Sequence, residues 1–154
     1  ARLASSYAAR YDIDETLAAQ IVDSALAEGL DPELGFRLVH AESLFRPNAR
    51  GPRGALGLTQ VMPGTARALD SRLLTEAQIL DPVTNLRIGF RHLRTLIERY
   101  GGDVRLGLLA YNRGEPAVDT ALRQGRDPEN GYSRRVLGTG QSRYTGNGLV
   151  GTLP

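Results

Sequence analysis

Hydrophobic residues recur with helical spacing along most of the chain, and residues typical of helix caps separate the apolar segments. A first apolar stripe follows Asp14, a common N-cap residue, and stops at Gly29, where a left-handed C-cap is frequent. Asp31 and Pro32 then signal the start of a second helix, which runs to about Ser43. No segment alternates polar and apolar residues over a useful length. The pattern therefore predicts an all-α protein.

Glycine and proline interrupt the helical pattern between residues 44 and 66, which predicts an ordered loop with short turns. Helical spacing resumes after this loop, and Asp81 with Pro82 repeats the start signal before the longest of the later helices. The helices predicted after the loop span residues 65–70, 75–80, 82–100, 103–111, 116–123 and 132–137.

Length and composition indicate one globular domain. With 154 residues, 41% of them hydrophobic and 23% charged, the chain fits a single core and lacks the composition of a disordered or fibrous protein. Helical spacing stops at residue 137, so we expect residues 1–137 to form the domain and residues 138–154 a flexible tail or linker. No run of about 18 apolar residues occurs, and the first residues lack the apolar stretch of a signal peptide. We therefore expect no transmembrane segment in this chain, whereas further domains outside it are compatible with the sequence.

The positive charge of the chain is weak and spread out. All 19 basic residues are arginines, and the formal net charge is +2. Four of them, Arg87, Arg91, Arg94 and Arg99, lie along one predicted helix without interleaved aromatic residues. That pattern is typical of a solvated helix face rather than of a nucleic-acid interface, so we expect no nucleic-acid partner.

Glu42 breaks the apolar stripe of the second predicted helix, because it lies four residues after Leu38 on the flank of that stripe. Taken alone, it is interpreted as a boundary residue that reaches solvent or pairs with Arg46. The alternative is a general acid, which requires a raised pKa, since an ordinary glutamate is protonated only about once in 500 molecules at pH 7. The negative end of the helix and apolar neighbours such as Phe45 and Met62 would both disfavour the carboxylate.

The residues that follow Glu42 decide between these readings. Residues 40–66, HAESLFRPNARGPRGALGLTQVMPGTA, closely resemble the lytic transglycosylase domain, which is related in fold to goose-type lysozyme. The resemblance covers about residues 17–137 and implies a single lysozyme-like helical domain with a substrate groove. Three departures concern loop contacts more than chemistry. Gly51 stands where the family usually carries serine, Arg113 stands where it carries a small residue, and the segment before Tyr132 matches poorly. Further matches are Asn85, Gly89, Ala110, Tyr111, Asn112, Gly114, Tyr132, Arg135, Val136 and Leu137.

The family resemblance implies a reaction with one protein carboxylate. Glu42 would protonate the β-1,4 glycosidic oxygen between N-acetylmuramic acid and N-acetylglucosamine in peptidoglycan, and then act as base. The C6 hydroxyl of the muramoyl residue would attack its own C1, which leaves a 1,6-anhydromuramoyl end. No metal or organic cofactor is required, and His40 and His92, the only histidines, show no metal-ligand spacing.

The same resemblance implies which side chains bind the glycan. Gln60 would offer its amide to sugar hydroxyl and N-acetyl groups, and the hydroxyl of Tyr132 would lie near the acid. Met62 is expected to fill the core with its bulk, or to form part of the groove wall. By the same resemblance, Ser43, Tyr111 and Asn112 would orient Glu42 or contact the substrate. The substrate-binding residues implied are Ser43, Gln60, Met62, Tyr111, Asn112 and Tyr132.

Two other functions stay open at this point. A goose-type-like lysozyme would hydrolyse the same bond and would need a second acidic residue, for which Asp70, Asp103 and Glu115 are candidates by residue type only. A non-catalytic peptidoglycan-binding module would keep the groove without turnover. All three readings share glycan strands as partner and an extracytoplasmic setting, periplasmic or phage-associated, with cell-envelope machinery as a further partner.

Overall fold

The computed structural model describes residues 1–139 and 143–151. Within these residues every regular element is a helix, which confirms the all-α prediction. The α-helices are α1 (Arg2–Tyr11), α2 (Glu15–Ala27), α3 (Pro32–Ser43), α4 (Pro63–Leu69), α5 (Glu76–Leu80), α6 (Pro82–Arg99), α7 (Val104–Arg113), α8 (Glu115–Arg123) and α9 (Tyr132–Leu137), with a 3₁₀ turn η1 at Pro52–Gly54.

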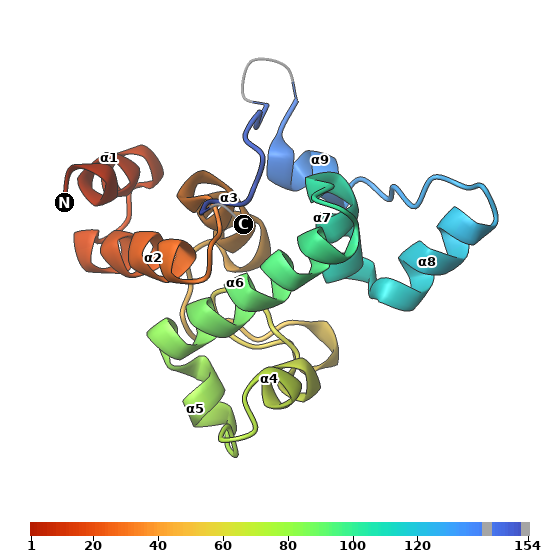
Figure 1. The fold of residues 1–154 in the computed structure, drawn as a ribbon. Coiled ribbons are helices and arrows are strands. Elements are labelled where there is room, and N and C mark those ends of the chain that lie inside the picture. Colours follow the sequence, from red (N-terminus) through yellow and green to blue (C-terminus); the bar gives the residue numbers. More distant parts are fainter. Residues whose placement is uncertain (140–142, 152–154) are drawn as a thin grey trace.

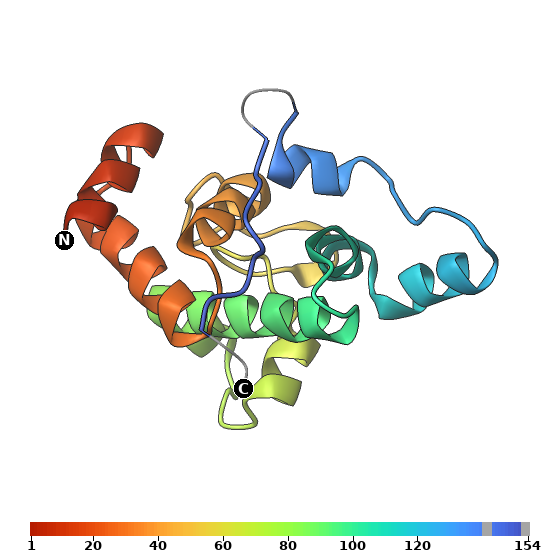
Figure 2. The ribbon, with the colours of Figure 1, turned by 45° about the horizontal axis from the view of Figure 1, so that its top comes forward.

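Helix α6 is the long central helix around which the others gather (Figure 1). It contacts α2, α4, α5 and α7, while α9 contacts both α3 and α7. Helices α1 and α2 lie at one edge of the molecule and α8 at the opposite edge (Figure 2). None of the described helices is long and apolar enough to cross a membrane.

The predicted helix starts are confirmed by their caps. Asp14, Asp31, Asp81 and Asp103 each accept a hydrogen bond from a backbone N–H in the first turn of the helix that follows. Gly29 has a φ of 70°, the left-handed conformation expected after α2. These signals are local, which is why the sequence alone places them.

Helix α1 is an element that the sequence pattern did not predict. It has no side-chain cap at its start, and it buries only Ala4, Tyr7 and Ala8. The ring of Tyr7 stacks on that of Phe36 with centroids 4.0 Å apart. Short helices are marginal by themselves, so this one depends on packing against residues far away in the sequence.

The end of the chain is not a loose tail in the part that the structure describes. Residues 143–151 run beside α3 to the end of α2 (Figure 2). The backbone N–H of Asp31 donates to the carbonyl of Gly148 at 2.8 Å, and the hydroxyl of Tyr144 donates to the Asp31 carboxylate at 2.6 Å. The aperiodic sequence concealed these contacts because they join single polar groups rather than a periodic face. Residues 140–142 and 152–154, also assigned to the tail, lie outside the described residues.

A buried asparagine holds the loop between η1 and α4. Asn85 is fully buried, and its side-chain oxygen accepts hydrogen bonds from the backbone N–H and the hydroxyl of Thr59 at 2.9 and 2.8 Å. Its side-chain nitrogen donates to the carbonyls of Leu56 and Ile79 at 2.9 and 3.0 Å. All four bonds involve groups shielded from water, so Asn85 fixes the path of residues 56–59.

The same loop approaches α6 so closely that a side chain cannot fit between them. A Cβ atom at Gly89 would lie 2.3 Å from the hydroxyl oxygen of Thr59. We expect Gly89→Ala to lower the free energy of unfolding by about 1–3 kcal/mol, as overpacking does, measured by denaturant titration. Gly64→Ala is the control, since nothing lies within 4 Å of its added Cβ. Equal stability of the two variants would contradict the close approach.

The arginine face of α6 is paired rather than simply solvated. Arg91 forms two hydrogen bonds to the carboxylate of Glu28, both at 3.0 Å. Arg87, Arg94 and Arg99 also lie within ion-pair distance of acidic side chains. The positive charge of the helix is therefore largely balanced.

Candidate active site

Glu42 occupies the last turn of α3, which ends abruptly one residue later. Leu44 and Phe45 both take left-handed backbone conformations, with φ of 51° and 60°. Such conformations are unfavourable for residues other than glycine and often occur at functional sites. They place Glu42 at the helix end whose partial negative charge disfavours a carboxylate.

The carboxylate of Glu42 meets a tyrosine from another helix. Tyr132, the first residue of α9 and almost fully buried, donates its hydroxyl to Glu42 Oε2 at 2.9 Å. Burial raises the pKa of Glu42 above its ordinary value, although the Tyr132 hydrogen bond and the positive charge of Arg135 oppose the rise. Among the residues that the structure describes, Glu42 forms no ion pair, so the alternative interpretation of a surface pairing with Arg46 is not supported.

Arg135 was not assigned a role from the sequence. Its guanidinium lies 5.3 Å from the centre of the Tyr132 ring, and its charge lowers the pKa of Glu42. The signal for this placement was the spacing of three residues from Tyr132, which puts both side chains on neighbouring positions of one helix turn. Arg135 therefore acts on the carboxylate from the same helix that supplies the hydroxyl.

Tyr111 connects Glu42 to the loop that Asn85 holds. The Tyr111 hydroxyl donates to the carbonyl of Thr59 at 2.7 Å. Burial raises the pKa of Tyr111, and the negative charge of Glu42 raises it further, so the two side chains interact electrostatically. Side chains from α3, α7 and α9 thus converge around one carboxylate.

A pocket of about 350 Å³ adjoins Tyr111. Its walls come from the loop before α4 and the start of α4, from α6, from the end of α7 and from the start of α8. Four of the residues that the family resemblance implied for substrate binding line it. The lining residues are Gln60, Val61, Met62, Thr65, His92, Ala110, Tyr111, Asn112, Arg113, Gly114, Glu115 and Pro116.

Ser43 has a different contact from the one expected. Its hydroxyl donates to the backbone carbonyl of Val39 at 3.1 Å, one turn back in α3, and the side chain is buried. Consecutive helix residues point about 100° apart, so Ser43 lies on the core side when Glu42 faces Tyr132. The structure therefore gives no orienting bond from Ser43 to Glu42.

Gln60 also differs from the expectation of a free amide donor. Its side-chain nitrogen donates to the carbonyls of Ala49 and Gly57, at 3.1 and 3.0 Å, and so holds the loop rather than the pocket. A Cβ at Gly51 would lie 2.0 Å from Gln60 Oε1. Glycine at position 51, where the family usually carries serine, therefore leaves room for the Gln60 side chain under the loop.

Met62 is not core filling, because it is 38% exposed and lines the pocket. Asn112 is exposed beside it, and its side-chain oxygen accepts a hydrogen bond from Asn130 at 3.0 Å. Both side chains therefore lie at the accessible surface of the pocket.

The three candidates for a second catalytic carboxylate have other contacts. Asp70 is paired with Arg72 and Arg87, and Asp103 caps α7. Only Glu115 lines the pocket. None of the three appears among the groups that shift the pKa of Glu42, which are its burial, a tyrosine and an arginine.

Replacing Tyr132 by Phe should raise the pKa of Glu42 further. The phenyl ring keeps the packing that buries the carboxylate, but the hydroxyl that stabilises its charged form is gone. NMR titration of the Glu42 carboxyl group measures the change. Tyr100→Phe, which removes a hydroxyl bonded to Asp119, is the control and should leave that titration unchanged. A lower pKa in Tyr132→Phe would contradict the arrangement.

The helical fold of the described residues, with a glutamate of raised pKa at the end of α3, is that of a lysozyme-like domain. Residues 20–132 match the family model described as the Transglycosylase SLT domain, and the chain belongs to that family. Helix α1 and residues 143–151 lie outside this match.

Relatives include the soluble lytic murein transglycosylase of Escherichia coli strain K12, 34% identical over 90 residues that cover 55% of this chain and 14% of that protein. The transglycosylase of Enterobacteria phage PRD1 is 42% identical over 85 residues, which cover 55% of this chain and 30% of that protein. This chain therefore spans only a small part of the E. coli relative and less than a third of the phage relative.

Two solved structures share the fold. The 70 kDa soluble lytic transglycosylase from Escherichia coli superposes with a TM-score of 0.70 at 26% identity, covering 77% of this chain and 22% of that one. An inactive glutamate-to-glutamine mutant of lytic transglycosylase Slt from Pseudomonas aeruginosa superposes equally well, with a TM-score of 0.70, 29% identity and the same two coverages of 77% and 22%.

Proposed function

We propose that this chain is a peptidoglycan lytic transglycosylase that cleaves the β-1,4 bond between N-acetylmuramic acid and N-acetylglucosamine. Family membership supports the class of reaction, and relatives named as murein transglycosylases support the substrate. Glu42 is the sole acid and base. The inactive glutamate-to-glutamine mutant among the structural relatives agrees with a glutamate-dependent reaction in this fold.

The proposed step keeps atoms and charges balanced. Protonated Glu42 gives its proton to the glycosidic oxygen as the bond from C1 to that oxygen breaks. The C6 hydroxyl of the same muramoyl residue bonds to C1, and the Glu42 carboxylate takes the hydroxyl proton. Well-placed intramolecular groups reach effective molarities of about 10⁵ M or more, so water competes poorly.

The proposal of a single catalytic carboxylate rests on which groups surround Glu42. The group with the raised pKa faces a tyrosine and an arginine, and no carboxylate acts on it among the described residues. Two-carboxylate glycosidases hold their second carboxyl group about 5–9.5 Å from the acid, where it acts as nucleophile or activates water. A site with one carboxylate favours a nucleophile supplied by the substrate.

Mass spectrometry of purified sacculi after digestion tests this proposal. We expect muropeptides with 1,6-anhydromuramoyl ends, each lighter by one water molecule than a hydrolysed product. Reducing muramic acid ends would instead establish a lysozyme, and intact sacculi with bound protein would establish a binding module.

The remaining roles are proposed on the same basis. Met62, Tyr111 and Asn112 form the wall that contacts the glycan, while Gln60 shapes the loop through its side-chain hydrogen bonds. Peptidoglycan strands are the partner, which requires an extracytoplasmic site of action, and relatives in phages agree with a phage-associated setting as well. Envelope machinery would enter through parts of the protein outside this chain.

A further inference from the structure

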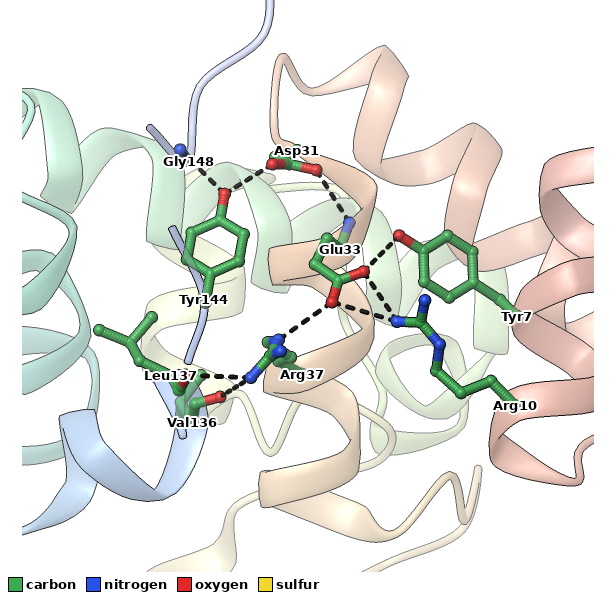
Figure 3. Close-up of polar contacts among 9 residues, drawn as sticks. All are labelled: Tyr7, Arg10, Asp31, Glu33, Arg37, Val136, Leu137, Tyr144 and Gly148. Atoms are coloured by element: carbon green, nitrogen blue, oxygen red, sulfur yellow. Dashed lines mark hydrogen bonds and ion pairs between the residues drawn. The ribbon is translucent and has the colours of Figure 1, made fainter. Parts of the chain in front are cut away.

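Arg37 joins the helix that carries Glu42 to the helix that carries Tyr132. From α3 its guanidinium donates to the carbonyl of Leu137 at 2.9 Å and reaches that of Val136 at 3.5 Å, at the end of α9 (Figure 3). These carbonyls belong to the last turn of α9, where backbone oxygens lack helical partners and the helix end is partly negative. A cation suits that position better than any neutral group.

Helix α9 is therefore attached to α3 at both of its ends. Arg37 binds the end of α9 at Leu137, and Glu42 accepts the hydroxyl of Tyr132 at its start. The paired residues are five positions apart on each helix and run in opposite order, so the two contacts fix position and direction together. A six-residue helix is only about 9 Å long, so its position on α3 depends on contacts such as these.

The guanidinium of Arg37 is itself held in place. Its Nε donates to Glu33 Oε1 at 3.2 Å, one turn earlier in α3. The hydroxyl of Tyr7 and the guanidinium of Arg10, both from α1, donate to the same carboxylate at 2.6 Å and at 3.0 Å (Figure 3). Although burial alone would raise it, the pKa of Glu33 is lowered by these hydrogen bonds and by the charge of Arg10. Glu33 thus stays charged and oriented toward Arg37.

We propose that Arg37, oriented by Glu33, is a positioning residue that holds α9 on α3 so that the Tyr132 hydroxyl meets Glu42. This inference rests on the proposed function for its effect on turnover. Arg37 acts on Glu42 only through the backbone of α9, whose last carbonyls it binds. Helix α1, which lies outside the family match, contributes because it fixes Glu33.

Kinetics of Arg37→Gln test the inference. Misplacement of a catalytic group by about 1 Å can reduce the rate on the order of 100-fold, so we expect kcat on soluble glycan strands to fall roughly tenfold to 100-fold, with KM little changed. Arg37→Lys keeps a donor for the Leu137 carbonyl and should recover most of kcat. If Arg37→Gln does not fold, Arg37→Lys replaces it in the cycle described next, with a smaller loss of kcat expected.

A double-mutant cycle separates positioning from stability. In a Tyr132→Phe background the Arg37 substitution should cost less in kcat than in the wild type, because the hydroxyl that it positions is already absent. Arg91→Gln is the matched control, since it breaks a comparable arginine–glutamate pair, with Glu28, that is remote from α9. We expect it to lower Tm and leave kcat unchanged. Fully additive losses, or an Arg37 variant that behaves like Arg91→Gln, would overturn the inference.

A measurement without turnover distinguishes failure of this inference from failure of the proposed function. Displacement of α9 both hydrates Glu42 and removes its hydrogen bond from Tyr132, which act on its pKa in opposite directions. Burial is the larger of the two contributions, so the pKa of Glu42 in Arg37→Gln should move down toward the ordinary value, in contrast to the rise expected for Tyr132→Phe, which keeps the burial. An unchanged NMR titration of Glu42 would reject the positioning role even if the enzyme forms anhydro ends. A shifted titration in a protein that forms no such ends would leave the positioning role standing and reject the proposed reaction.

Discussion

Glu42→Gln is expected to lower lysis of purified peptidoglycan by about 10²–10⁴-fold or more, because the amide cannot donate or accept the catalytic proton. Gln has nearly the same shape, and its oxygen can still accept the Tyr132 hydroxyl, so glycan binding should persist. Turbidity loss of sacculi and a pull-down with insoluble peptidoglycan measure the two properties. Undiminished lysis would remove Glu42 from the mechanism.

Glu42→Gln should also show how the raised pKa of Glu42 lowers the stability of the fold as pH rises. Because the pKa of Glu42 is higher in the folded than in the unfolded chain, the folded state binds more protons, and stability falls as pH rises through this range. Gln does not titrate and avoids this loss. We therefore expect the Tm of Glu42→Gln to exceed that of the wild type by a margin that grows from pH 4 to pH 8. A margin independent of pH would contradict the raised pKa.

Asn85→Ala is expected to lower the free energy of unfolding by roughly 3–5 kcal/mol, since four hydrogen bonds to buried groups are lost at about 1 kcal/mol each. The loss should extend to activity, because Thr59, which Asn85 holds, accepts the Tyr111 hydroxyl. Denaturant unfolding measures the stability. The exposed Asn48 provides the control, and Asn48→Ala should stay within about 0.5 kcal/mol of the wild type. A small effect of Asn85→Ala would mean that the loop has another anchor.

Local signals in the sequence predicted most of the helices. Aspartate caps bond to the backbone two or three residues away, so their effect is written in adjacent positions. The hydroxyls of Tyr7 in α1 and of Tyr144 bond to carboxylates 26 and 113 positions away, and no periodicity marks these contacts. The helices that hold the core were therefore predictable, whereas the segments that close over α3 were not.

In the candidate site, too, local features were predictable from the sequence and long-range contacts were not. The motif singled out Glu42, and the raised pKa agrees with the reasoning from burial and helix position. The directions in which the neighbouring side chains point were harder to predict, because a motif records residue type and not orientation. Ser43 turns to Val39, Gln60 folds under its own loop, and Met62 faces outward. Helical spacing could have placed Ser43, since it lies four residues after Val39, but only tertiary contacts decide the other two.

The exposed position of Met62 has a practical consequence, since it is the only methionine in the chain. Carbon-13 labelling of methionine methyl groups would give one resonance, and that resonance would come from the pocket wall. Its shift on addition of muramoyl oligosaccharides would report occupancy without any other signal to assign. Peroxide would convert the same thioether to a sulfoxide, so the protein carries its own spectroscopic and chemical reporter of the pocket proposed to bind glycan.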